Sequence, residues 1–473
     1  MLDLSALNDY PDSPDTATSA RWDESRQRRR LLEGTWKEDL EKQLAQEIDA
    51  SRIAIWKSPD LTKNILRSIV NQLSVLYDQS PIVRNQSPES VDVMRQLTSN
   101  AGLWQLAAYN QQLCIAQRES AIRVDVVGDD PRLLYRVIPA DLLYCEADVD
   151  EPDEPVTIYE YRIRTGPDGD AIWTRDMLSI AGDPYYRVET TGGVDLTEYY
   201  LGGRFSGEDY PYRKADGTPI LPFAFYHAKR TGKLWNAYTG HELACGTLRV
   251  AVFWSLFSHV LRDCSWPQRY FINAEVLGLR GDIATGEARI ATDPASVLNL
   301  GARDPGTATI AGQFQAGGDP EAIGRAIRDY SADLAADFDI TPADIQRSSG
   351  DARSGFAIFL TREGQRHAQR RYSPNFDRGD SSLLSATAVL MNRLAGTSLP
   401  EDGWSLKYNG LPVSMEEAKT IIEGYEKRVE LGIMSRPQLL AALDGITEEE
   451  ARSRLRQIMI DSQEFSEPPQ IQE

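Results

Sequence analysis

Apolar residues surround the segment from Leu248 to Leu261 on every side, with only four polar interruptions. This pattern predicts a helix that protein must cover nearly all round. The run is too short and too interrupted for a bilayer span, so we expect a helix packed inside protein. Neighbouring subunits are one possible source of that cover.

A second helix is predicted to begin at Asp319, which has the residue type of an N-cap and is followed by Pro320 at the first helical position. Apolar residues recur along it at helical spacing, and an acidic row lies beside that stripe. A solvated helix face is the simple interpretation of the row, and a wall that repels a passing polyanion is the functional one. The row consists of Asp329, Asp333 and Asp337.

Between these helices, the sequence predicts a small β module. Its strand candidates are Gln268–Val276, Ser296–Leu300 and Thr307–Phe314. Glycines between the candidates supply the turns. The pattern is therefore a helix, a compact β insert and a returning helix.

A polar loop is predicted at residues 340–354, and Arg347 and Arg353 are its only cations. The next helix begins near Gly355 and is expected to break or kink at Pro374 and the following DRGD turn. A basic row on this helix has the spacing of the earlier acidic row, which favours a charge match between helices or subunits over DNA contact. The basic row consists of Arg362, Arg366 and Arg370.

The N-terminal half changes from helical periodicity to period two near Ile115. Amphipathic helices are expected over 65–77 and 87–106, and strands follow as far as the apolar segment ILPFAFYHA. This order predicts a mostly antiparallel module and, with the helices, an α+β fold. The Arg26–Arg30 run lies in a predicted helix among carboxylates, so paired surface charge is favoured over nucleic-acid contact. Residues 1–20 are expected to be an irregular arm.

The C-terminal part reads as a small helical cap. Its first helix, from Met415 to Leu431, ends at Gly432, and Ser435 with Gln438 has the spacing of a capping box. Thr447 and Glu450 repeat that spacing before a further helix. The tail is rich in proline and glutamine.

Composition limits the classes of function. The chain has 473 residues and a net charge of -20, which argues against tight non-specific binding of nucleic acid over the general surface. Its four cysteines include no CxxC pair, so a zinc site or disulfide framework is not expected and a reducing compartment fits best. No secretory leader is recognisable.

Catalytic motifs are missing from the sequence. There is no GxxxxGK[ST] phosphate loop, GxGxxG turn or HExxH motif. The acidic run Glu146–Glu154 lacks calcium-loop spacing and is interpreted as a solvated turn. We therefore expect no enzyme activity, no cofactor and no metal.

Several short patterns occur in an order similar to that of the portal proteins of tailed bacteriophages. NILRSIVNQLSVLYDQSPIV resembles their N-terminal body helix, and RVIPADLLYCEAD resembles their strand-proline-strand signature. DGTPILPFAFYHA is similar to the segment before the first stem helix. DARSGFAIFL resembles the start of the helix after the tunnel loop, and YNGLPVSMEEA with LGIMSRPQLL resembles the start of the crown. The resemblance covers residues 40–460.

The resemblance implies the phage portal fold, with an α/β wing, a two-helix stem, a small β-containing clip and a helical crown, assembled as a ring. Its parts map onto this chain as follows: N-terminal arm 1–39, N-terminal part of the wing 40–237, first stem helix 238–264, clip 265–318, second stem helix 319–339, tunnel loop 340–354, C-terminal wing helices 355–409, and crown and tail 410–473.

The family resemblance, to its siphophage-like group in particular, also implies a function. Such a protein forms a dodecameric ring at one capsid vertex, a channel for DNA packaging, retention and ejection. The ring is a docking platform for the packaging motor (terminase) and a head-tail adaptor, and it contacts the major capsid protein and double-stranded DNA but no membrane. The expected location is the virion, after assembly in the host cytoplasm. The alternatives are another ring-forming head-tail adaptor and an intracellular carboxylate-dependent hydrolase.

Within the portal interpretation, the predicted sites fall into two groups. The residues expected to face or flank the DNA channel are Asp329, Asp333, Asp337, Arg347 and Arg353. The residues expected at the subunit interface are Phe253, Trp254, Phe257, Arg362, Arg366 and Arg370.

Overall fold

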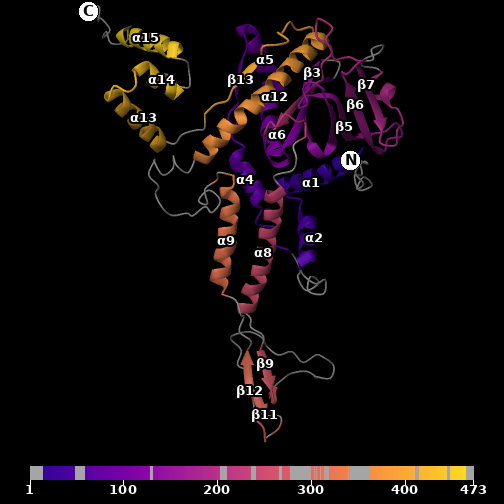
Figure 1. The fold of residues 1–473 in the computed structure, drawn as a ribbon, viewed down its shortest axis with the longest axis vertical. Coiled ribbons are helices and arrows are strands. Elements are labelled where there is room, and N and C mark those ends of the chain that lie inside the picture. The colour runs from indigo at the N-terminus through magenta and orange to yellow at the C-terminus, as the bar shows by residue number, and fades with distance from the viewer. Residues whose placement is uncertain are drawn as a thin grey trace, which may run out of the picture. The chain divides into compact units, whose positions relative to one another are not determined.

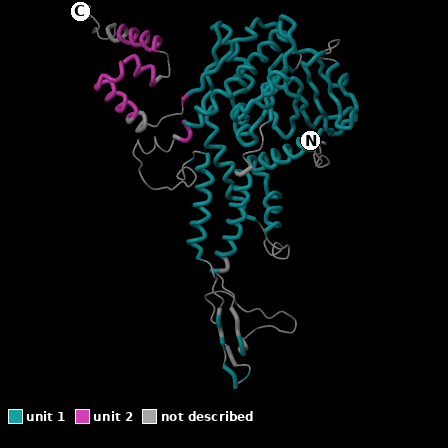
Figure 2. Tube along the Cα trace, in the orientation of Figure 1, with its two compact units in different colours: residues 1–345, 367–409 teal, residues 346–366, 410–473 magenta. Residues whose placement is uncertain are grey.

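The computed structural model describes residues 14–47, 59–127, 131–202, 210–235, 241–265, 269–276, 300–302, 304, 306–308, 310–313, 319–338, 340, 363–410, 415–444 and 448–464. The chain divides into two compact units (Figure 2). The first comprises residues 1–345 and 367–409, and the second comprises residues 346–366 and 410–473.

Helices dominate the start of the first unit. Two of their boundaries follow from local capping: the Ser87 side chain accepts a hydrogen bond from the Ser90 N–H, and Gly102, at φ 64°, separates two helices that the sequence pattern had joined. Residues 16–20 of the predicted irregular arm are helical, because α1 begins at Thr16, whereas residues 1–13 of that arm lie outside the described residues. These helices are α1 (Thr16–Glu33), α2 (Lys37–Glu47), α4 (Ile65–Leu73), α5 (Pro88–Asn100) and α6 (Leu103–Gln117).

Antiparallel sheets form the β part of the first unit, as the period-two pattern predicts. Of the two larger sheets, one has the order β3-β2-β8 and the other has the order β4-β5-β6-β7. Short 3-10 helix η2 (Ala140–Leu142) joins β3 to β4. The strands are β2 (Glu119–Val127), β3 (Arg132–Pro139), β4 (Leu143–Ala147), β5 (Pro155–Thr165), β6 (Ala171–Ser179), β7 (Tyr185–Thr190) and β8 (Phe223–His227). Helix α7 (Thr197–Leu201) follows β7.

Helix α12 (Glu363–Ala395) packs against the three-stranded sheet (Figure 1). Its contact with β8 is very close: a Cβ added to Gly379 would lie 2.5 Å from the Tyr226 ring. The sequence indicates a break or a kink at Pro374 and the DRGD turn; the break is wrong, because the helix continues through both. Phe376, Asp380 and Leu383 lie buried on one face of α12, and this burial offsets the hydrogen bond that the proline N–H cannot make.

Helices α8 (His241–Ser265) and α9 (Pro320–Ala336) lie side by side in the first unit (Figure 1). The strands described between them in sequence pair as two ribbons, β10-β11 and β12-β9. The expected single strand at 268–276 is divided by Asn273, whose φ is 47°. These strands are β9 (Arg269–Ile272), β10 (Ala274–Val276), β11 (Leu300–Ala302) and β12 (Ile310–Gln313). A further pair joins β1 (Ile82–Arg84) to β13 (Ser405–Lys407).

The second unit is helical, as predicted. Gly432, at φ 69°, follows the end of its first helix. The capping box is confirmed: the Gln438 N–H donates to Ser435 Oγ at 3.3 Å, and the Ser435 N–H donates to Gln438 Oε1 at 3.0 Å. Its helices are α13 (Met415–Glu430), α14 (Arg436–Asp444) and α15 (Glu448–Glu464).

Candidate functional site

The α8–α9 helix pair holds most of the predicted site residues in the described chain, and glycines set its spacing. A Cβ built on Gly246 of α8 would lie 2.7 Å from Cδ2 of Leu334, so the helices approach closely at this glycine and a larger residue would require the Leu334 side chain to shift. Phe253 of α8 meets Tyr330 of α9 edge to face, with ring centroids 6.1 Å apart. The two helices therefore form one packed hairpin.

The first half of α8 is covered within the chain by α2 and α4 as well as α9. Two polar residues of α8, Thr247 in its first half and Ser255 just past its middle, have partners elsewhere in the first unit. The Leu66 N–H donates to Thr247 Oγ1 at 3.0 Å, and the Asp60 N–H donates to Ser255 Oγ at 2.8 Å. Each hydroxyl donates in turn to a carbonyl one helical turn earlier, so these interruptions are satisfied inside the fold.

By length and composition alone, residues Leu243–Leu261 would pass for a membrane span, with a mean hydropathy of 1.4. The expectation that the run is too short and too interrupted is wrong on that measure. Half of the stretch is nevertheless buried inside the chain, as in a core helix of a soluble protein.

The second half of α8 is less covered. Phe253, Trp254 and Phe257, the predicted interface aromatics, are half-buried. Phe257 contacts α9 at Gly324, and Trp254 contacts Phe257 with ring centroids 5.3 Å apart. Leu261 is 43% exposed. The chain thus covers these aromatic side chains in part and leaves apolar surface at their edge.

The acidic row of α9 is exposed at all three positions, Asp329, Asp333 and Asp337. The N-cap prediction is confirmed, because Asp319 accepts a hydrogen bond from the Glu321 N–H at 3.0 Å. The row continues one turn toward the N-terminus as Arg325, which pairs with Glu321 at 2.9 Å. The exposed face is therefore acidic toward the helix C-terminus and mixed in charge toward its start.

The predicted cationic residues fall mostly elsewhere. Arg347, Arg353 and Arg362 lie outside the described residues. On α12, Arg366 is half-buried and Arg370 is exposed. The structure does not bring these two together with the acidic row in any described contact.

The Arg26–Arg30 run is paired inside the chain, as the sequence indicates. Arg29 lies 2.6 Å from buried Asp141, and Arg30 contacts Asp39 at 2.6 and 2.7 Å. The run is more buried than a surface charge cluster, because Arg28 is 2% exposed and donates to the Ala116 carbonyl. It attaches α1 to the body of the first unit.

Sequence reasoning missed a buried charge cluster between the two sheets, which we name the Arg123 cluster. Arg123 Nη1 lies 2.7 Å from Glu160 and 2.9 Å from Asp176, and Nη2 donates to Tyr186 Oη at 2.6 Å. Arg164 also pairs with Asp176. Burial alone would raise the pKa of Asp176, but the guanidinium groups around it hold that pKa below its usual value.

A second buried centre, the Asp380 cluster, has no cation. The Asp380 carboxylate accepts hydrogen bonds from Tyr77 at 2.7 Å, Tyr226 at 2.8 Å and Tyr408 at 2.8 Å. Burial raises the Asp380 pKa to about 6 even though the three tyrosine hydrogen bonds act to lower it. No local sequence signal identifies this cluster, since its members come from four distant segments.

Nothing in the described residues assembles a metal site: no group of three or more His, Cys, Asp or Glu side chains is suitably placed there. The acidic run at 146–154 forms a turn, in which Asp148 Oδ1 accepts from the Asp150 and Glu151 N–H groups. Arg230 and Arg378 pair with Asp153 and Glu154 of this turn. Cys114 and Cys145 are buried thiols, and burial raises both pKa values.

Comparison with known proteins yields structural neighbours only. No family model matches the sequence, and no curated protein matches it. A chain from the virion of a native gene transfer agent particle has a TM-score of 0.42 and 13% identity, covering 81% of this chain and 91% of that one.

Two further neighbours come from the necks of such particles. A chain from the neck of an empty particle, computed with C6 symmetry, has a TM-score of 0.42 and 13% identity over 80% of this chain and 89% of that one. A chain from the neck of a native particle, computed with C12 symmetry, has a TM-score of 0.40 and 14% identity over 81% and 90%. The chain is thus similar at low identity to chains of gene transfer agent virions and necks, and these values assign it to no family.

Proposed function

We propose that the chain is the subunit of a ring-shaped portal, a structural protein through which double-stranded DNA enters and leaves a phage-like capsid. The proposed ring contains twelve copies at one capsid vertex. It holds no catalytic centre and serves as the docking platform for a packaging motor and a head-tail adaptor, beside the major capsid protein.

The observation that carries this proposal is the unequal cover of α8. Its first half is buried by its own chain, whereas Leu261 and the edges of Trp254 and Phe257 remain partly exposed. Exposed apolar surface on a monomer is removed from water when copies associate. In a ring, the hairpins of successive copies lie beside one another, which supplies that cover through a heterologous contact that closes.

The second unit supports association independently. In its described part, Ala451 is the one buried apolar residue. Large apolar side chains are instead exposed on its helices and connecting turns, which is expected where a unit packs against other copies. They are Ile422, Leu431, Ile433, Leu443, Ile458, Met459 and Ile460.

Charge supports a channel through which DNA slides. Each copy carries a net charge of -20, and a ring multiplies it by the number of copies. The exposed row Asp329, Asp333 and Asp337 adds fixed negative charge on the stem hairpin. A polyanion beside such a surface finds few cations to hold it and moves without sticking.

Light scattering coupled to size exclusion, with negative-stain images, tests the assembly. The full chain is expected to form rings with a central opening. Leu261→Glu places a charge on the partly exposed end of α8 and should shift the population to folded monomers. Val149→Glu is the matched control, because Val149 is 93% exposed on a turn. A wild-type chain that stays monomeric at every salt concentration would refute the proposal.

A separate measurement tests the charge argument. Changing Asp329, Asp333 and Asp337 together to Asn should increase the affinity of assembled rings for linear duplex DNA, most clearly at low salt. The matched control changes Asp92, Asp150 and Asp402, which lie outside the α8–α9 hairpin, to Asn. Equal DNA affinity in the two triple variants would show that the row does not face the DNA path.

A further inference from the structure

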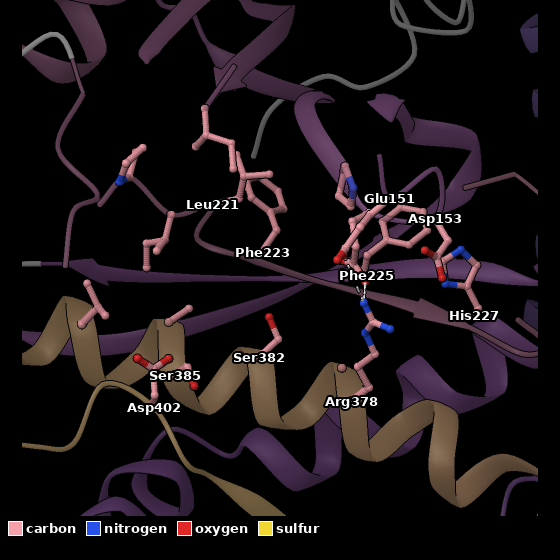
Figure 3. Close-up of a pocket in the computed structure, with 18 of the residues that line it drawn as sticks. Glu151, Asp153, Leu221, Phe223, Phe225, His227, Arg378, Ser382, Ser385 and Asp402 are labelled. Atoms are coloured by element: carbon pink, nitrogen blue, oxygen red, sulfur yellow. Dashed lines mark hydrogen bonds and ion pairs between the residues drawn. The ribbon is translucent and has the colours of Figure 1, made fainter. Parts of the chain in front are cut away.

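A groove of about 470 Å³ lies between β8 and α12 in the first unit (Figure 3). Three ion pairs join charged residues of its lining: Arg378–Glu154, Arg230–Asp153 and Lys214–Asp402. Because these charges neutralise one another, they do not point to a charged ligand. The α8–α9 hairpin differs, since it leaves apolar side chains partly uncovered on two of its sides.

Apolar side chains of α8 are left partly uncovered on both flanks of the strip that faces α9. Gly246 and Phe257 mark this strip, because both approach α9. Successive residues of an α-helix are rotated by about 100°. Leu256 therefore lies on one flank, and Trp254 and Leu261 lie on the other. Leu256 and Trp254 are half-buried, and Leu261 is exposed.

Helix α9 also has two flanks, on either side of the strip that faces α8. Gly324 and Leu334 mark that strip, because both approach α8. By the same rotation, half-buried Ile323 and Tyr330 lie on one flank, whereas exposed Arg328 lies on the other.

A contact between two aromatic rings shows which flanks lie on the same side of the hairpin. Phe253 lies on the Leu256 flank of α8 and meets Tyr330 edge to face. We name the two sides by their residues: the Tyr330 face consists of Phe253, Leu256, Ile323 and Tyr330, and the Trp254 face consists of Trp254, Leu261, Arg325 and Arg328. The hairpin thus has two different sides, each of them partly apolar.

The apolar residues of both faces lie at the same level along the hairpin. Trp254 adjoins Phe253, which contacts Tyr330. Phe257, one turn further along α8, contacts α9 beside Ile323. Rotation about a ring axis keeps every residue at its own height. With the hairpins aligned along that axis, the Tyr330 face of one copy is therefore level with the Trp254 face of its neighbour.

Charge also distinguishes the two faces. Beside the Tyr330 face lie the exposed residues Arg249, Asp333 and Asp337, and beside the Trp254 face lie the exposed residues Lys63, Glu321, Arg325 and Arg328. The Lys63 ammonium group lies 5.4 Å from the centre of the Trp254 ring. Carboxylates outnumber cations in the first set, and cations outnumber carboxylates in the second. These signs favour contact between unlike faces and oppose contact between like ones.

We propose that the Tyr330 face of one copy packs against the Trp254 face of the next copy. This inference rests on the proposed ring and assigns its stem contact to two unlike surfaces. Such a contact has a direction, so a growing assembly keeps one face of each kind uncovered until the ring closes. The acidic row crosses this arrangement obliquely: Asp329 lies opposite α8, beside the DNA path, whereas Asp337 faces the next copy.

Mixing two single variants tests the direction of the contact. Tyr330→Glu disables the Tyr330 face, and Leu261→Glu disables the Trp254 face. Each variant alone should sediment as a folded monomer. An equimolar mixture should form dimers, because each variant keeps the face that the other has lost. In analytical ultracentrifugation, the dissociation constant of the mixed dimer should be at least tenfold below that of either variant alone.

Leu256→Glu is a second variant of the Tyr330 face and takes the place of Tyr330→Glu should that chain fail to fold. Tyr199→Glu, at a 57% exposed position outside the hairpin, is the matched control and should form rings like the wild-type chain. Dimers or rings of either face variant alone would overturn the inference. A monomeric mixture beside wild-type rings would refute this contact alone, whereas a monomeric wild-type chain would refute the proposed ring and the contact with it.

Discussion

The Arg123 cluster and the Asp380 cluster bury carboxylates in opposite ways. In the first, Glu160 and Asp176 are neutralised by guanidinium groups at hydrogen-bond distance. In the second, Asp380 is surrounded by three tyrosine hydroxyls, with no cation among its hydrogen-bond partners. Both centres join distant segments, but only one of them balances its charge.

The difference appears in the two pKa values, which shift in opposite directions. The Asp176 pKa is lowered, so its contribution to stability is present above the unfolded value of 3.8 and is lost as pH falls. The Asp380 pKa is raised to about 6, so the contribution of this group to stability is fully present below pH 3.8 and is lost as pH rises through about 6. Hydrogen bonds alone do not replace a counter-charge in a buried site.

The largest expected effect comes from removing the cation at the centre of the Arg123 cluster. Arg123→Met should lower the free energy of unfolding by about 3 kcal/mol, because it leaves buried carboxylates short of compensation. Denaturant titration followed by tryptophan fluorescence measures the loss. Arg175→Met removes a more exposed pair with Glu189 and should cost under about 1 kcal/mol. Equal losses of unfolding free energy in the two variants would contradict the difference expected between a buried and a more exposed ion pair.

A pH series on Asp380→Asn sharpens the comparison. This variant removes the ionisation, so its stability relative to the wild-type chain should increase by about 2–3 kcal/mol between pH 4 and pH 7. Asp176→Asn should show the opposite trend, becoming relatively less stable as pH rises from about 3 to 5, because the wild-type carboxylate gains stability there. Parallel pH profiles for the two variants would show that both carboxylates behave alike.

A smaller effect is expected when one hydroxyl is removed from the Asp380 cluster. Tyr408→Phe should lower the free energy of unfolding by about 1.5 kcal/mol, since the lost hydrogen bond has a charged acceptor. It should also move the pH-dependent decline upward, because the tyrosine hydrogen bonds hold the Asp380 pKa down. Tyr199→Phe, at a 57% exposed position, should change stability by under about 0.5 kcal/mol. If the stability of this variant declined at the same pH as that of the wild-type chain, Tyr408 would have no influence on the pKa of Asp380.

Features set by neighbouring residues could be predicted from the sequence. The caps at Ser87 and Asp319 and the capping box at Ser435 each depend on residues two or three positions away, and all three are present. The segments with period-two alternation are strands in the structure, because this pattern also depends only on residues close in sequence. In the candidate site, the exposure of the acidic row follows from helical periodicity on α9.

Features set by distant residues could not be predicted. Pro374 should interrupt a helix judged locally, yet α12 continues because β8 and the tyrosines pack along it. The buried position of Arg28 depends on a carbonyl 88 residues away. The place of β8 beside β2 in the described sheet becomes visible only when the sheet order is known, because the sequence of a strand does not identify its neighbours.

The contact between Gly379 and the Tyr226 ring restricts how this protein can diverge. No side chain larger than hydrogen fits at position 379 while a six-membered ring occupies position 226, given the 2.5 Å approach. In related sequences, an alanine at 379 should therefore appear together with a smaller residue at 226. Such paired exchange would allow distant members to be recognised even where every short pattern has been lost.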